Sequence, residues 1–311
     1  MVLPAAVAIL AILIDRTIGD PPSRYHPVAL LGRFIGWWGR PPLYPVPLQR
    51  SMGLLLWFIT TALFILPFFL VERFTPFPLY FLIAPFLLKA CFAWRSLEEH
   101  ASSVVHAIDR SIVEARIQAG RMVSRPTETL EREQLLSAAY ESVAENIVDS
   151  ITAPLLFYFA GEILGGLGLA FAALYRAANT MDAMLGYPDE RGRLGWAAAR
   201  IDDILNFVPA RITGTLILCY FLSRGRGREA WFAFSRDHRK RPGINGGIPM
   251  SLLAGGVGVQ FEKPGAYRIG IPERSLEDAG EDFMHHSNTI VIGFLTILVV
   301  ALFLLGLPAN V

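Results

Sequence analysis

Charged side chains are scarce in this chain. Asp, Glu, Lys and Arg make up 18% of its 311 residues, whereas hydrophobic residues make up 53%. A soluble domain usually carries about 25% charged residues. The apolar residues also gather into long runs. Together these features exclude a water-soluble globular protein and indicate an integral membrane protein.

Several other features are missing, and each absence narrows the range of functions. The formal net charge is only +1, so the chain lacks the basic field of a nucleic-acid-binding protein. Its two cysteines, Cys91 and Cys219, both lie within apolar runs, which argues against a disulfide framework. The patterns GxxxxGK(S/T), CxxC, HExxH and GxSxG are absent, so any nucleotide is bound without a Walker phosphate loop.

The apolar runs predict membrane spans, because a spanning helix needs about 20 mostly apolar residues. Two of the runs are interrupted by Pro154 and Pro209, and a third contains Lys89, which either reaches the membrane surface or faces protein. The sequence therefore predicts an all-α, polytopic integral membrane helical bundle of about six spans, some of them broken, in a single domain over residues 1–311. The six runs are Val2–Ile14, Ser51–Val71, Phe77–Trp94, Ile151–Tyr175, Ile204–Leu222 and Asn288–Leu307.

Basic residues concentrate in three connecting segments. Five arginines lie between the first two runs, six lie in residues 95–150, and ten Lys or Arg lie in residues 223–285. The positive-inside rule places these segments in the cytoplasm and the C-terminus outside, which indicates a multi-pass protein of the cytoplasmic membrane. The polar residues 176–203 would then lie outside, unless the broken helices open a polar cavity toward the cytoplasm.

Two segments outside the runs have their own predicted structure. Residues 96–150 carry apolar positions three and four apart, which is typical of amphipathic helices. Gly120 and Arg125–Pro126 separate two such helices, so a cytoplasmic helical hairpin is expected. Residues 223–285 are interpreted as a cytoplasmic loop region, with irregular backbone over the Pro- and Gly-rich residues 236–275.

A row of acidic residues ends the hairpin. Glu141, Glu145 and Asp149 recur at four-residue spacing, so they share one face of a helix and repel one another. The row runs into an apolar span, where desolvation makes this repulsion costlier. We therefore expect a compensating cation, either Mg²⁺ or an arginine. The alternative is a solvated acidic stripe, most readily at Glu141.

Two further polar clusters occur in RAANTMD and ARIDDILNFVPAR. Ionisable residues at membrane depth are costly and usually face a polar interior. The spacing places Arg200, Asp203, Phe207 and Arg211 on one helical side, which predicts an ion-pair network within the helix. The alternative is that the network only locks two helices together. The polar residues of the clusters are Arg176, Asn179, Asp182, Arg200, Asp202, Asp203, Asn206 and Arg211.

The N-terminal region and a late loop add further candidates. His26 precedes a proline, where it is either a ligand or a packed or capping residue. Gly32 and Gly36 form a GxxxG pattern that favours helix packing. The loop DHRKRPGINGGIP combines the basic run Arg236–Arg241 with glycines, a combination that suits phosphate. A juxtamembrane anchor to anionic lipid is the other interpretation of the basic run.

Five motifs, in this order, resemble the adenosylcobinamide-phosphate synthase family of cobalamin biosynthesis. They are DRTIGDPPSRYHPV, ESVAENIVDSITAPLLFY, YRAANTMDAMLGY, GWAAARIDDILNFVPARIT and DHRKRPGINGGIPMSLLAGGVGV. The resemblance covers nearly the full length. It implies a membrane enzyme that joins (R)-1-amino-2-propanol, or its O-phosphate, to a propionate of adenosylcobyric acid, consuming ATP with Mg²⁺ and giving adenosylcobinamide or its phosphate. The lipid bilayer and other cobalamin-pathway enzymes are the further partners expected.

This reaction suggests a role for each polar residue. We expect the metal to be bound by Glu145, Asp149 and Asp182. We expect catalysis from Asp202, Asp203, Arg200 and Arg211. The residues expected to bind substrates are Glu141, Asn146, Arg176, Asn179, Asn206, Arg239, Lys240, Asn245 and His26. The alternative function is a non-catalytic corrinoid-binding scaffold or a transporter of the same pathway, although no internal repeat supports transport.

Overall fold

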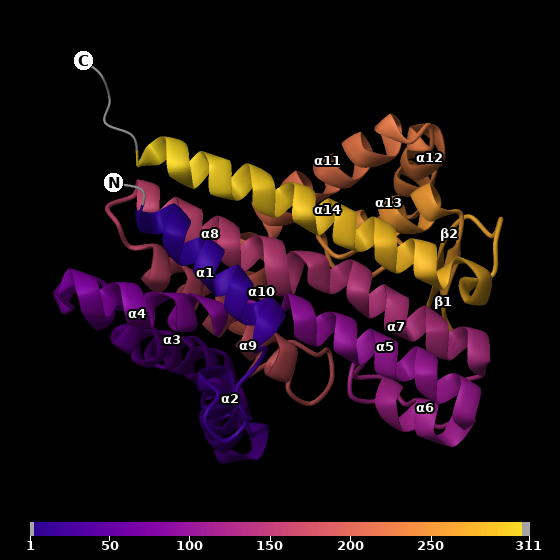
Figure 1. Cartoon of the computed structure of the whole chain (residues 1–311). Coiled ribbons are helices and arrows are strands. Elements are labelled where there is room, and N and C mark those ends of the chain that lie inside the picture. The colour runs from indigo at the N-terminus through magenta and orange to yellow at the C-terminus, as the bar shows by residue number, and fades with distance from the viewer. Residues whose placement is uncertain (1–2, 307–311) are drawn as a thin grey trace. The chain divides into compact units, whose positions relative to one another are not determined.

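The computed structural model describes residues 3–306 as a series of helices with one two-stranded sheet (Figure 1). The chain divides into two compact units. Within the described residues, the first unit comprises residues 3–93, 153–206 and 296–306, and the second comprises residues 94–152 and 207–295. Both cysteines are free thiols, as predicted.

Three helices are long and apolar enough to cross a membrane, namely Val46–Phe74, Phe77–Arg110 and Leu276–Leu305. Trp196–Leu205 and Phe207–Ser223 together form a bent pair with a break at Asn206, which is either a fourth, broken span or a re-entrant loop. The protein is thus a polytopic helical membrane protein, and the predicted all-α class is confirmed apart from one β-hairpin.

The sequence predicted about six spans, whereas the structure has three, or four with the bent pair. Two of the predicted runs do not form a span. Helix α1 (Leu3–Thr17) has only 15 residues, which is short for a bilayer. The run Ile151–Tyr175 is divided between α8 (Ala153–Ile163) and α9 (Gly168–Leu185). Of the interruptions predicted from Pro154 and from the glycines of this run, the one at Gly165 and Gly166 separates the two helices, whereas Pro154 lies inside α8. Neither part reaches the length and hydropathy of a single span.

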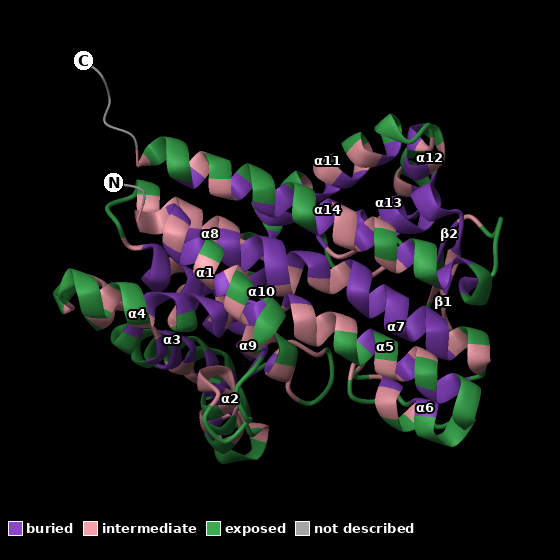
Figure 2. Cartoon of the chain, viewed as in Figure 1, coloured by how far each residue is buried: buried purple, intermediate pink, exposed green. Residues whose placement is uncertain are grey.

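The longest apolar helices carry many exposed residues (Figure 2), and large hydrophobic residues are among them. On the helix Gln49–Phe74, Leu55 and Phe58 are 51% and 58% exposed, and on Leu276–Leu305, Ile297 and Leu304 are 56% and 59% exposed. Apolar exposure of this extent is rare on proteins surrounded by water. These faces are therefore the lipid-contacting surface.

Helix α9 is the centre of the first unit, where it packs against α2, α3, α4, α8 and α10. Its alanines allow this close packing, since Ala172, Ala173, Ala177 and Ala178 are all fully buried. Gly32 and Gly36 of α2 lie against Met184 of α9, which confirms their predicted packing role. The remaining bounds are α2 (Pro27–Trp38), η1 (Pro41–Leu43), η2 (Val46–Leu48), α3 (Gln49–Phe74), α4 (Phe77–Lys89) and α10 (Trp196–Leu205).

The second unit contains the predicted helical hairpin. Its first arm is bent at Ser111 and ends at Gly120, and its second arm begins with a capping box between Glu131 and Gln134. Both parts of the first arm pack on the second. The elements of this unit are α5 (Trp94–Arg110), α6 (Ile112–Ala119), α7 (Arg132–Asn146), η3 (Ile147–Thr152), α11 (Phe207–Ser223), α12 (Gly227–Asp237), α13 (Gly247–Val257), β1 (Gln260–Lys263), β2 (Tyr267–Gly270) and the first part of α14 (Leu276–Leu305).

The prediction of irregular backbone over residues 236–275 is wrong. The segment contains α13 and the antiparallel strands β1 and β2, in which Phe261 pairs with Ile269. Every residue of α13 is buried, because the helix is packed by α11, α12 and α7. A Cβ atom on Gly255 would lie 2.5 Å from Ala233 Cβ, and one on Gly256 would lie 2.3 Å from the Phe221 ring. The glycines therefore permit close helix packing rather than marking a loop.

A π-helical turn, η3, joins α7 to α8. Pro154 lies two residues after this turn and has no N–H to donate, so regular α-helical hydrogen bonding cannot continue through it. The wider turn changes the helical phase after Asn146. Consequently Asp149, which lies within η3, does not continue the strict four-residue stacking of Glu141 and Glu145 that the sequence predicted. Turns of this kind are frequent at functional sites.

Candidate functional site

A buried polar cluster lies between α9 and α10 in the first unit. Asn206 donates from Nδ2 to Asp202 Oδ2 over 2.9 Å, and Tyr175 donates its hydroxyl to Asn206 Oδ1 over 2.8 Å. Asn179 lies beside the same carboxylate, and Asp182 is close enough for its charge to interact with that of Asp202. The structure thus brings together four of the residues that the sequence predicted for the site.

Two atoms of helices α9 and α10 have no hydrogen-bond partner among residues 3–306. They are Asp202 Oδ1 and Arg176 Nε, and both are shielded from solvent. Buried polar atoms are nearly always paired, since an unpaired one costs about 1–3 kcal/mol. An unpaired carboxylate oxygen attracts an ammonium group or a metal ion, and an unpaired guanidinium nitrogen attracts an acceptor. The cluster therefore has the chemistry of a ligand site.

The neighbouring predicted residues Arg200 and Asp203 occupy the outer side of α10. Their N–O distance is 3.7 Å, and their side chains are 67% and 31% exposed. This half of the predicted ion-pair network is confirmed. The other predicted member, Arg211, donates instead to the Phe207 carbonyl oxygen over 2.7 Å and to Asn245 Oδ1 over 3.0 Å.

Glu141 in the second unit is buried and has a full set of partners. Its Oε1 accepts from Ser137 Oγ at 2.6 Å and from Arg125 at 3.3 Å, while Oε2 accepts from Tyr267 at 2.9 Å. Burial, and then the adjacent Glu141 carboxylate, raise the pKa of Tyr267 well above its ordinary value, so the phenol stays protonated and donates. The interpretation of Glu141 as part of a solvated stripe is therefore wrong.

Arginine also compensates the second member of the acidic row. Glu145 forms an ion pair with Arg241, 96 positions later in the chain. Asn146 is engaged locally, donating to the Ser142 carbonyl oxygen and accepting from Ser150 Oγ, both at 2.9 Å. Of the two cations that the sequence left open, the structure provides arginine at Glu141 and Glu145.

The predicted metal residues are divided between the two units. Glu145 and Asp149 belong to the second unit and Asp182 belongs to the first. Across residues 3–306, no three His, Cys, Asp or Glu side chains are arranged to hold a metal ion. A Mg²⁺ ion commonly uses only one or two protein carboxylates together with substrate phosphates. The adjacent carboxylates of Asp182 and Asp202 fit that smaller requirement.

Two basic residues of the run Arg236–Arg241 pair with Asp237, whose side chain is fully buried. Arg236 and Lys240 both approach this carboxylate to 2.7 Å, and the Gly270 N–H donates to it over 2.9 Å. Burial by itself raises the pKa of Asp237, but these donors outweigh it and hold the pKa below its ordinary value. Lys240, predicted to bind substrate, thus has a structural partner that ties α12 to β2.

Arg239 and Arg211 line a cavity of about 520 Å³ in the second unit. Asn245 is buried behind it and accepts a hydrogen bond from Arg211. The sequence assigned all three residues to catalysis or substrate binding, and the structure brings them to one place.

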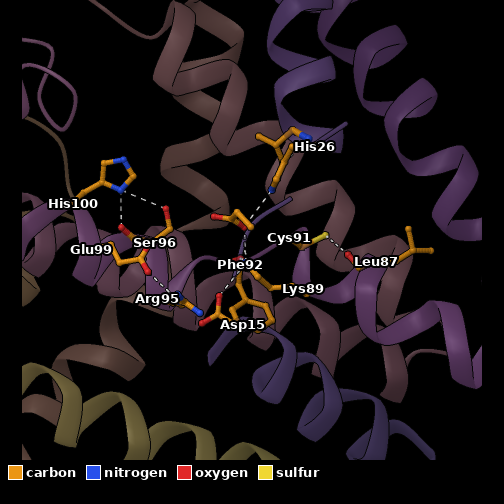
Figure 3. Close-up of polar contacts among 12 residues, drawn as sticks. Asp15, His26, Leu87, Lys89, Cys91, Phe92, Arg95, Ser96, Glu99 and His100 are labelled. Carbon is orange, nitrogen blue, oxygen red and sulfur yellow. Dashed lines mark hydrogen bonds and ion pairs between the residues drawn. The ribbon is translucent and has the colours of Figure 1, made fainter. Parts of the chain in front are cut away.

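His26 caps helix α2 in the first unit, accepting from the Val28 N–H at Nδ1 over 3.1 Å. Its Nε2 lies 3.4 Å from Asp20, which also accepts from Lys89 at 2.6 Å (Figure 3). Lys89 is buried and lies 3.0 Å from Asp15 as well, so it faces protein. Burial alone raises the pKa of Asp20, but His26 and Lys89 outweigh it and hold the pKa well below its ordinary value.

Sequence reasoning missed several side chains that complete these clusters. Lys89 was noted as facing either protein or the membrane surface, but its partners Asp15 and Asp20 were not predicted, although a single charge inside an apolar run requires a counter-ion. The signal for Arg241 was its place in a basic run, but nothing local linked it to Glu145. Tyr175, Arg125 and Tyr267 carried no pattern that distinguished them from other aromatic or basic residues.

Comparison with known proteins identifies related sequences over most of the chain. The CobD/Cbib protein family matches residues 8–302. A probable cobalamin biosynthesis protein CobD from Methanothermobacter thermautotrophicus is 41% identical, with 88% of this chain and 89% of that protein covered. A protein of the same description from Pyrococcus furiosus is 37% identical, with 94% and 97% covered. The cobalamin biosynthesis protein CobD of Dehalococcoides mccartyi is 36% identical, with 87% and 88% covered. No solved structure matches significantly.

Proposed function

The chain belongs to the CobD/Cbib family of cobalamin biosynthesis proteins, and we propose that it is an ATP-dependent acid–amine ligase. The reaction joins (R)-1-amino-2-propanol or its O-phosphate to a propionate of adenosylcobyric acid. The product is adenosylcobinamide or its phosphate. The observation that carries this proposal is the buried cluster around Asp202, whose Oδ1 has no hydrogen-bond partner within residues 3–306.

The chemistry requires an activated acid and a free amine. A carboxylate does not condense with an amine in water, so the propionate first takes the γ-phosphoryl group of ATP and releases ADP. The amine nitrogen then attacks the acyl carbon, phosphate leaves, and one proton is lost from nitrogen. Asp202 is the residue that accepts this proton, because its unpaired Oδ1 is buried and free to face the amine.

The surrounding residues keep Asp202 in position. Asn206 and Tyr175 form a hydrogen-bonded chain that fixes one oxygen of the carboxylate and leaves the other unpaired. Asp182 adds a second negative charge that favours an ammonium group or a divalent cation. If Mg²⁺ binds here, Asp182 would hold it, because Asp202 Oδ1 faces the amine, and the ion would neutralise phosphate charge. Arg176 supplies a hydrogen-bond donor for an anionic group of the substrate.

The direct test is a reconstituted reaction with purified protein in detergent or nanodiscs. Adenosylcobyric acid, aminopropanol phosphate and MgATP are supplied, and the corrinoid products are separated and identified by mass. We expect the amide product and ADP without any added protein. Corrinoid binding with no amide product would instead support the non-catalytic scaffold.

We further propose that the α9–α10 connection is reached from the cytoplasm, where ATP is available. The exposed Glu190 lies in this connection, and the exposed Arg73 follows a span on the side predicted to be external. In a background with Cys219→Ser, we expect a cysteine replacing Glu190 to resist an impermeant thiol reagent added to intact cells. A cysteine replacing Arg73 should react. Equal external labelling of both positions would contradict the cytoplasmic assignment.

A further inference from the structure

The cavity between α11, α12 and α13 has an unbalanced charge. Two guanidinium groups line it, Arg211 from α11 and Arg239 just after α12, and its lining contains no acidic residue. All of these residues lie in the second unit. Its volume of about 520 Å³ falls within the range of about 300–1,000 Å³ typical of small-molecule sites.

Neither guanidinium group is neutralised by the protein. Arg211 donates only to neutral oxygens, the Phe207 carbonyl and the Asn245 side chain. Arg239 forms no hydrogen bond or ion pair with any residue that the structure describes. The neighbouring basic residues are different, because Arg236 and Lys240 pair with Asp237, and Arg241 pairs with Glu145. Arg239 is therefore the cation of this run that is available for an external anion.

Apart from Thr215 and His238, the rest of the cavity is apolar and partly aromatic. Trp231 and Phe234 lie on one wall, and the Phe234 ring stacks on His238 with a centroid distance of 4.5 Å. Ile248 and Leu252 of α13 lie on another wall. An inorganic anion would leave these apolar surfaces unused. The combination instead suits an anionic group attached to a flat or apolar organic body.

We propose that this cavity binds a phosphate ester, with Arg211 and Arg239 contacting the phosphate and the wall around Trp231 and Phe234 contacting the organic part. Guanidinium groups form paired, charge-assisted hydrogen bonds with phosphate oxygens. Nucleotides and anionic phospholipids both carry this chemistry. Identifying the ester as the ATP of the ligase reaction rests on the proposed function, whereas phosphate-ester binding itself does not.

The test uses full-length protein in phosphatidylcholine nanodiscs and the variant Arg239→Gln. Arg239 is exposed and unpaired, so its replacement leaves the fold intact. The matched control is Arg228→Gln, which removes an exposed arginine of α12 that does not line the cavity. MgATP binding is measured by titration calorimetry, and retention of phosphatidylglycerol is measured by native mass spectrometry in nanodiscs that contain it.

If the ligand is a nucleotide, MgATP binds wild type and Arg228→Gln equally and Arg239→Gln about 10-fold or more weakly. If it is a lipid, phosphatidylglycerol retention is lost in Arg239→Gln alone. Either result supports the proposal that the cavity binds a phosphate ester. Unchanged binding of both ligands in Arg239→Gln, or an equal loss in Arg228→Gln, overturns it. Because binding is measured without adenosylcobyric acid or amine, failure of the ligase reaction does not affect this result.

Discussion

Each of the two units contains a pair of neighbouring carboxylates, Glu141 and Glu145 in the second and Asp182 and Asp202 in the first. The two pairs differ in the hydrogen-bond and charge partners that the protein gives them. Glu141 and Glu145 in the second unit are neutralised by Arg125 and Arg241. Asp202 in the first unit has one oxygen paired to Asn206 and the other unpaired, although it is buried. Buried charge therefore does not by itself identify a site in this protein. The difference lies in whether the chain supplies the partner or leaves its place to a ligand.

The largest expected effect follows from removing the unpaired carboxylate. Asp202→Asn keeps the size and the hydrogen bond capacity of the side chain but cannot accept a proton from the amine. We expect ligase turnover to fall by at least about 100-fold, as for loss of a general base. Thermal unfolding should change little, because no internal ion pair is broken.

The matched control for this variant is Asp189→Asn. Asp189 lies in the exposed α9–α10 connection and pairs with Arg191. Turnover in the control should remain close to wild type. If both variants lose activity equally, the comparison between a ligand-binding and a structural carboxylate fails.

The second-largest effect is expected on stability, at Glu141 in the second unit, whose carboxylate is fully paired within the protein. Glu141→Gln leaves Arg125 buried without its counter-charge, and both side chains are only about a tenth exposed. Loss of one partner from a buried pair is expected to cost about 3 kcal/mol. Thermal unfolding should therefore occur at lower temperature while turnover per folded molecule stays normal. Unchanged unfolding with lost activity would restore the substrate-binding role that the sequence predicted for Glu141.

A smaller, pH-dependent effect is expected at Asp237. Its pKa is below the ordinary value in the folded protein, so it contributes stability above the unfolded-state pKa of about 3.9. This contribution is lost as the pH falls through the folded-state pKa. The difference in melting temperature between wild type and Asp237→Asn should be full at neutral pH and shrink below about pH 4. A difference independent of pH would show that the carboxylate charge is not responsible.

The smallest effect is expected at the outer side of α10. The exposed Arg200–Asp203 pair contributes only a few tenths of a kcal/mol, as is typical of i,i+3 surface pairs. Arg200→Gln should leave thermal unfolding unchanged within error and reduce turnover far less than Asp202→Asn. A loss of turnover as large as that of Asp202→Asn would assign Arg200 the catalytic role predicted from the sequence.

Much of the fold could be predicted because its signals are local. The helical hairpin is predicted by apolar spacing that ends at a glycine. The packing role of Gly32 and Gly36 in α2 is predicted because glycine has no side chain to hold a neighbouring helix away. The prediction failed at α13, because glycines that usually break a helix here allow Ala233 and Phe221 to approach it. The helix is stabilised by its neighbours, which the sequence does not reveal.

The sequence could predict which residues belong to the candidate site, but not which of them are buried or which contact one another. Adjacent residues such as Asp202 and Asp203 differ in burial only because α10 has a particular phase against α9. The neutralisation of Glu145 depends on an arginine 96 positions away. The side of the helix on which Asp149 lies depends on a π-helical turn, which the sequence indicates only through Pro154. These are tertiary effects, and spacing along the chain does not determine them.

The central claim is that Asp202 is left unpaired for the amine. It is tested most directly by saturation-transfer NMR of (R)-1-amino-2-propanol with wild type, Asp202→Asn and Glu141→Gln, without ATP or corrinoid. We predict a binding signal for wild type and Glu141→Gln and its loss in Asp202→Asn. An undiminished signal in folded Asp202→Asn would contradict the account.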